Sequence, residues 1–124
     1  MIDPHSAPLV TDLEHLREAL RRFAAERDWH RFHTPKNLAA ALSVEAAELL
    51  EHFQWLTAEE SANLSEVTLS KVRLEMADVL LYLIRLADKL NVDLMSAATE
   101  EIRINAAKYP ADQVRGDARK YSEY

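Results

Sequence analysis

The most apolar stretch of this chain is Glu75-Met76-Ala77-Asp78-Val79-Leu80-Leu81-Tyr82-Leu83-Ile84. After Glu75, the apolar side chains from Met76 to Ile84 point to every side of a helix, and only Asp78 and the Tyr82 hydroxyl interrupt them. A helix that is apolar all round belongs to a protein interior. We therefore expect this stretch to lie inside a helical protein, where its acidic residues need a partner.

The sequence on both sides of this stretch predicts an all-α protein. Apolar residues recur at helical spacing, and no segment alternates as a strand does. Thr11 with Glu14 has the pattern of a capping box, Thr34-Pro35 that of an N-cap followed by proline, and Asp93 that of an N-cap. The expected fold is a four-helix bundle with a C-terminal tail, its helices running from about Thr11 to Arg27, Pro35 to Trp55, Glu66 to Leu90 and Asp93 to Tyr109.

Length and charge exclude several classes of protein. The 124 residues predict a single domain over 1–124, with 1–10 and 111–124 as flexible or partner-docked tails. The net charge of −6 argues against nucleic-acid binding. Gly116 is the only glycine, so a glycine-rich phosphate loop is excluded.

The expected location of the protein is cytoplasmic. The chain has no cysteine, which fits a reducing compartment. Residues 1–8 lack the apolar core of a signal peptide, and the longest apolar run, Val79 to Ile84, is too short to cross a bilayer. We therefore expect no membrane partner.

Two pairs of acidic residues are the part of the sequence that indicates a possible binding site. Glu45 and Glu48 share one strip of a helix, as do Glu75 and Asp78, because residues three apart are neighbours on a helix. If the strips face each other, like charges about 4 Å apart repel by roughly 4 kcal/mol at an effective dielectric near 20. A bound cation relieves this repulsion, and oxygen ligands suit Mg²⁺ or Mn²⁺ rather than zinc.

Each candidate group also has a structural alternative. Asp78 could form a buried salt bridge with Lys71 or Arg85 instead of binding a metal. Rings at helix ends, such as Trp29, His33 and Trp55, could stack on a nucleobase or pack at the edge of the core. His52 lies on the same strip as Glu45 and Glu48 and is a candidate partner for the acids.

Taken together, these motifs resemble the all-α nucleoside triphosphate pyrophosphohydrolases of the MazG type. The pattern consists of Trp29 to His33, Glu45-x-x-Glu48, Trp55, Glu75-x-x-Asp78 and Asn105-x-x-Lys108-Tyr109-Pro110. The strings Phe23 to Trp29 and Phe53 to Trp55 are most similar to the dCTP pyrophosphatase branch. One departure is Leu20, which stands where that branch carries a histidine.

This resemblance implies a role for each motif. The implied magnesium ligands, with Mn²⁺ possible, are Glu45, Glu48, Glu75 and Asp78. The implied nucleotide contacts are Trp29, His30, Arg31, Phe32, His33, Trp55 and Tyr82, with Asn105 and Lys108 near the phosphates. The resemblance also implies a homodimer or homotetramer with the active site near a subunit interface.

The implied reaction is hydrolysis of a nucleoside triphosphate, with dCTP or a modified dCTP expected, to the monophosphate and pyrophosphate. Such a reaction clears unwanted nucleotides from the pool. Glu45 or Glu48 is the expected base, and the sequence does not choose between them. Two alternatives stay open: a broad-specificity or dUTP-type pyrophosphohydrolase, and a non-catalytic helical assembly module.

Overall fold

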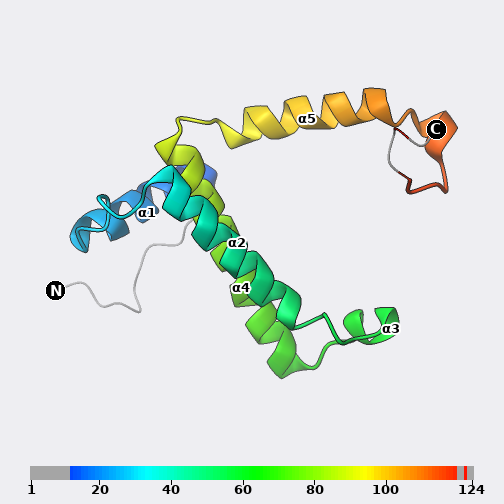
Figure 1. Cartoon of the computed structure of the whole chain (residues 1–124), viewed down its shortest axis with the longest axis horizontal. Coiled ribbons are helices and arrows are strands. Elements are labelled where there is room, and N and C mark those ends of the chain that lie inside the picture. The colour runs from blue at the N-terminus through cyan, green and yellow to red at the C-terminus, as the bar shows by residue number, and fades with distance from the viewer. Residues whose placement is uncertain (1–11, 120–121, 123–124) are drawn as a thin grey trace. The chain divides into compact units, whose positions relative to one another are not determined.

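The structure is a computed structural model that describes residues 12–119 and residue 122. All the elements in this part of the chain are helices, which confirms the predicted all-α class. They are α1 (Leu13–Glu26), α2 (Pro35–Glu51), α3 (Ala58–Ser61), α4 (Glu66–Lys89), α5 (Leu94–Lys108) and α6 (Ala111–Val114) (Figure 1). The four long helices occur where the sequence predicts them. The expected tail 1–10 lies outside the described residues.

The first of two compact units spans Met1–Asn91 and contains α1 to α4. Within it α4 packs along α2 and also contacts α1 (Figure 1). The core lies between these helices and is formed by Ala24, Leu38, Val72, Ile84 and Ala87. Helix α4 therefore provides most of the core.

The apolar stretch of α4 is buried on only part of its circumference. Ile84 is buried, but the side chains of Met76 and Leu80 are 58% and 42% exposed in this single chain. The prediction that the whole stretch is interior is therefore only partly correct. Packing against α2 and α1 covers one side of the helix and leaves the other side open.

Three of the long helices begin directly after a polar residue whose side chain caps the helix N-terminus. Helix α1 begins after Asp12, whose carboxylate accepts the His15 backbone N–H at 2.8 Å, so the predicted N-cap at Thr11 is wrong. Thr34 caps α2 with Pro35 in its first turn, as predicted. Asp93 caps α5 by accepting the Ser96 N–H at 3.0 Å, also as predicted.

Helix α2 ends at Glu51, before the predicted end at Trp55. The N–H groups of His52 and Phe53 bond to carbonyls three residues back, at 3.3 and 2.8 Å, which tightens the chain into a turn. The following connection contains α3, which starts with a capping box between Thr57 and Glu60. This reciprocal cap stabilises a new helix start and so favours the early end of α2.

The second unit spans Val92–Tyr124 and contains α5 and α6. Helix α5 is a single helix whose apolar side chains Met95 and Ile102 are 63% and 70% exposed. The short helix α6 follows Pro110, inside the segment expected to be a tail. The place of α5 in a four-helix bundle, and the single-domain assignment, stay predictions. None of the described helices has the length and apolar character of a membrane span.

Candidate active site

Three acidic side chains converge where α2 and α4 pack together. Glu45 and Glu48 on α2 and Glu75 on α4 each offer a carboxylate oxygen, and these oxygens lie within 4.8 Å of one another. All three residues are half-buried. Three of the four acids therefore meet between the two helices, where the sequence left the facing of the two acidic strips open.

The fourth predicted ligand, Asp78, lies one helical turn beyond Glu75. It is half-buried, and its charge acts on Glu45, but it is not among the three residues whose oxygens converge. Its role as a metal ligand stays a prediction.

The electrostatics of the cluster are unfavourable for Glu45. Its pKa is raised from the ordinary 4.5 to about 7 by burial, then by a hydrogen bond with Glu48, and then by the negative charges of Glu48, Asp78 and Glu75. Without a cation, the cluster therefore holds a proton near neutral pH.

The residues present fit a hard divalent cation. The Oε2 atoms of Glu45 and Glu75 are buried and have no hydrogen-bond partner in the described part of the chain. Leaving buried charged oxygens without a partner is costly. Oxygen-only ligands suit Mg²⁺ or Mn²⁺, and a cation at this point would satisfy both orphaned atoms.

His52 lies beside the cluster, directly after α2. Its Nε2 atom is 4.0 Å from Glu75 Oε1, and the two side chains are 22% and 24% exposed. His52 also lines a hollow of about 660 Å³ together with Leu56 and Glu59 of the following connection and Thr68 of α4. Its place on the strip of Glu45 and Glu48 was the sequence signal for this contact.

The alternative salt bridge of Asp78 is absent. Arg85 pairs instead with Asp88, at 3.3 Å, and within residues 12–119 neither Lys71 nor Arg85 bridges to Asp78. The structural explanation through these two counter-ions is therefore wrong.

The predicted ring segment forms a tight turn between α1 and α2. Asp28 has a left-handed φ of 53°, and the Trp29 N–H bonds back to the Ala24 carbonyl at 2.9 Å. The Trp29 ring packs edge-on against Phe23 at 5.7 Å and against His33 at 6.1 Å between ring centres. Trp29 is still 43% exposed, so it both packs at the core edge and presents a free face.

The other predicted nucleotide contacts are spread over both units. His30 bonds to Arg85, Arg31 pairs with the exposed Asp28 at 3.2 Å, and Phe32 is 55% exposed beside Arg31. Tyr82 is half-buried on α4, and Trp55 is 86% exposed after α2. Asn105 and Lys108 lie on α5 of the second unit, so their nearness to the acids stays a prediction.

The fold and the cluster define an all-α protein with a candidate divalent-cation site between two adjacent helices. Residues 40–124 match the sequence model of the MazG-like family, and the chain belongs to this family. The predicted family resemblance is thereby confirmed.

Known relatives agree with the predicted branch. The dCTP pyrophosphatase 1 of Homo sapiens is 43% identical over 113 residues, which cover 90% of this chain and 66% of the relative. The dCTP pyrophosphatase 1 of Bos taurus is 39% identical over 122 residues, covering 97% of this chain and 72% of the relative. This chain thus spans about two thirds of the human protein's length.

A solved structure supports the fold. The pyrophosphatase from Archaeoglobus fulgidus superposes with a TM-score of 0.76 and is 39% identical in sequence. The match covers 83% of this chain and 96% of that chain. A solved pyrophosphatase therefore shares most of the architecture described above.

Proposed function

We propose that this chain is a nucleoside triphosphate pyrophosphohydrolase that converts dCTP, or a modified dCTP, to the monophosphate and pyrophosphate. The observation that carries the proposal is the convergence of Glu45, Glu48 and Glu75 oxygens within 4.8 Å. It is supported by membership of the MazG-like family and by relatives named dCTP pyrophosphatase 1.

The cation of this proposal is Mg²⁺, with Mn²⁺ as the alternative. Glu45, Glu48 and Glu75 hold it, and Asp78, one turn from Glu75, completes the ligand set. A bound ion of this kind neutralises charge on the phosphate oxygens and lowers the pKa of the attacking water. The orphaned oxygens of Glu45 and Glu75 support this assignment.

The carboxylates supply the base for the reaction, and residues of α5 bind the leaving group. Glu45 or Glu48 takes a proton from a water molecule, whose oxygen attacks the α-phosphate and breaks its bond to the oxygen that bridges to the β-phosphate. The water oxygen stays on the phosphate that it attacks, and pyrophosphate leaves. Lys108, with Asn105, supplies positive charge and a hydrogen-bonding group toward the leaving pyrophosphate.

The rings hold the base in this proposal. Trp29 presents a half-exposed indole and Trp55 an almost fully exposed one, and every nucleobase has a face on which such a ring stacks. His30, Arg31, Phe32, His33 and Tyr82 complete the nucleotide contacts. Leu20, in place of the histidine of the branch, makes base preference the feature in which this chain can differ from its relatives.

The proposed assembly is a homodimer or homotetramer. Several large apolar side chains of α2 and α4 are more than half exposed in the single chain, among them Val44, Leu50, Val67, Leu74 and Met76. Apolar surface of this extent is typical of a protein interface. The expected cytoplasmic location is part of the same proposal.

Release of pyrophosphate from a nucleotide panel tests the activity. We expect Mg²⁺-dependent release from dCTP or 5-methyl-dCTP that exceeds release from dUTP and dATP. Equal rates with all four nucleotides would favour a broad-specificity enzyme. If none of them released pyrophosphate with Mg²⁺ or Mn²⁺, the chain would be a helical assembly module without this activity.

A further inference from the structure

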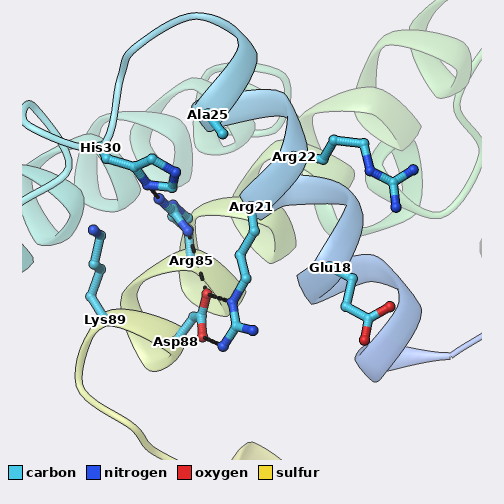
Figure 2. Close-up of a pocket in the computed structure, with 8 residues that line it drawn as sticks. All are labelled: Glu18, Arg21, Arg22, Ala25, His30, Arg85, Asp88 and Lys89. Carbon is cyan, nitrogen blue, oxygen red and sulfur yellow. Dashed lines mark hydrogen bonds and ion pairs between the residues drawn. The ribbon is translucent and has the colours of Figure 1, made fainter.

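A buried arginine on α4 connects the ring segment to the helical core. Arg85 is 4% exposed. Its Nε atom donates to His33 Nδ1 at 3.1 Å, and its Nη2 atom lies 2.5 Å from His30 Nδ1 (Figure 2 draws the contact with His30). A guanidinium group has only donors, so both histidines accept through Nδ1 and carry no proton there.

The guanidinium also forms an ion pair with Asp88. Arg85 Nη1 donates to Asp88 Oδ2 at 3.3 Å, and Arg21 of α1 binds both oxygens of Asp88, at 2.7 and 2.5 Å. Figure 2 shows this chain of contacts at the side of a hollow of about 600 Å³. Hydrogen bonding to Arg21 lowers the pKa of Asp88, which therefore stays ionised at neutral pH. Arg85 is thus oriented before any ligand binds.

His33 passes this orientation to Trp29. The two rings meet edge-on, with centres 6.1 Å apart and planes at 63°, and the backbone N–H of His33 also donates to the backbone carbonyl of Trp29 at 3.1 Å. Phe23 covers another side of the indole. His33 is therefore one of two rings that hold Trp29 while its free face stays open.

We propose that Arg85 is a positioning residue for the nucleobase: through His33 and His30 it holds the turn of residues 28–33 so that the indole of Trp29 keeps one orientation. The inference rests on the proposed function, in which Trp29 contacts the base. Arg85 lies seven residues after Asp78 on α4, about 10 Å along the helix axis. It therefore acts on base binding rather than on bond cleavage.

The kinetic test replaces Arg85 with an uncharged side chain of similar length. Arg85→Met should raise KM for dCTP about tenfold and lower the ratio of kcat/KM for dCTP over dUTP, because a misplaced indole weakens base contact. The kcat at saturating dCTP should stay within about twofold of the parent value. Arg73→Met is the matched control, since Arg73 is exposed on the same helix and has no side-chain partner in the described residues. An unchanged KM and an unchanged base ratio in Arg85→Met would overturn the inference.

A spectroscopic test needs no activity. The chain has two tryptophans, so it gives two indole N–H signals in a ¹⁵N spectrum, which Trp55→Phe assigns. Arg85→Met should shift and broaden the Trp29 signal and leave the Trp55 signal in place. If the Trp29 signal does not change, Arg85 does not position this ring.

A second variant covers the case in which Arg85→Met does not fold. His33→Phe keeps a ring beside Trp29 but has no nitrogen to accept from Arg85, and it should raise KM and shift the Trp29 signal in the same way. Parent values for both would contradict the inference. If the parent protein releases no pyrophosphate, the proposed function is overturned and, with it, the nucleobase role of Arg85, even where Arg85→Met changes the Trp29 signal.

Discussion

Glu45 on α2 and Glu75 on α4 each bury one carboxylate oxygen that lacks a hydrogen-bond partner among the described residues, although their ligand oxygens lie within 4.8 Å of each other. The repulsion between carboxylates this close together opposes the packing of α2 against α4, unless a proton or a cation neutralises part of the charge. This relationship is the physical basis for a cation site between α2 and α4.

The acids of the cluster should be essential for hydrolysis. Glu48→Gln keeps the shape of the side chain but removes a ligand or base, so we expect pyrophosphate release to fall at least 10²-fold. Glu51→Gln, at an exposed position of the same helix, should behave like the parent chain. Retained activity in a folded Glu48→Gln protein would contradict the assignment.

The raised pKa of Glu45 predicts a pH-dependent stability. Between pH 4.5 and about 7 the metal-free native state keeps a proton that the unfolded chain releases, so the free energy of unfolding should fall as the pH rises through this range. Urea unfolding in EDTA at several pH values measures this slope. In Glu45→Gln the free energy of unfolding should fall less over this pH range than in the parent protein. An identical slope in the parent and in Glu45→Gln would argue against the pKa shift.

His33 should contribute a slope of the opposite sign. Burial, and then the charges of Arg85, Lys89 and His30, lower its pKa below 6.5, so the native state resists protonation. The stability of the parent should therefore decrease as the pH falls below 6.5, until the pH reaches the pKa of His33 in the folded protein. His33→Phe should lose this contribution, and urea unfolding between pH 5 and 7 detects the difference.

Asp88 should be important for stability. Its side chain is 7% exposed and neutralises the buried Arg85, so Asp88→Asn should lower the free energy of unfolding by about 3 kcal/mol. Asp112→Asn, at an exposed position of α6, serves as the control and should change stability little. A loss below about 0.5 kcal/mol in Asp88→Asn would show that the ion-pair network is not structurally important.

The features that the sequence predicts well are local ones. The helix starts after Thr34 and Asp93 follow from capping chemistry, and the acidic strips follow from the three-residue spacing of Glu45 with Glu48 and of Glu75 with Asp78. The apolar residues around Phe53 and Trp55 continue a helical pattern, however, so the end of α2 at Glu51 is not evident from periodicity alone. The turn there depends on i−3 hydrogen bonds and on the cap of the next helix.

Features that depend on tertiary contacts were not predictable. Which of the four acids converge is decided by the packing of α4 against α2, and three of them do so. The bonds of Arg85 to His33 and His30 join residues 52 and 55 positions apart, for which no sequence spacing gives a signal. The sequence instead suggested Lys71 or Arg85 as a counter-ion of Asp78.

Metal binding by the acid pairs is the central claim, and calorimetric titration of the metal-free protein with Mn²⁺ or Mg²⁺ tests it directly. The parent chain and Glu51→Gln should show the same saturable binding, whereas Glu45→Gln on α2 and Glu75→Gln on α4 should each lose it. Binding that persists unchanged in both of these variants would show that the carboxylates of α2 and α4 do not form one cation site.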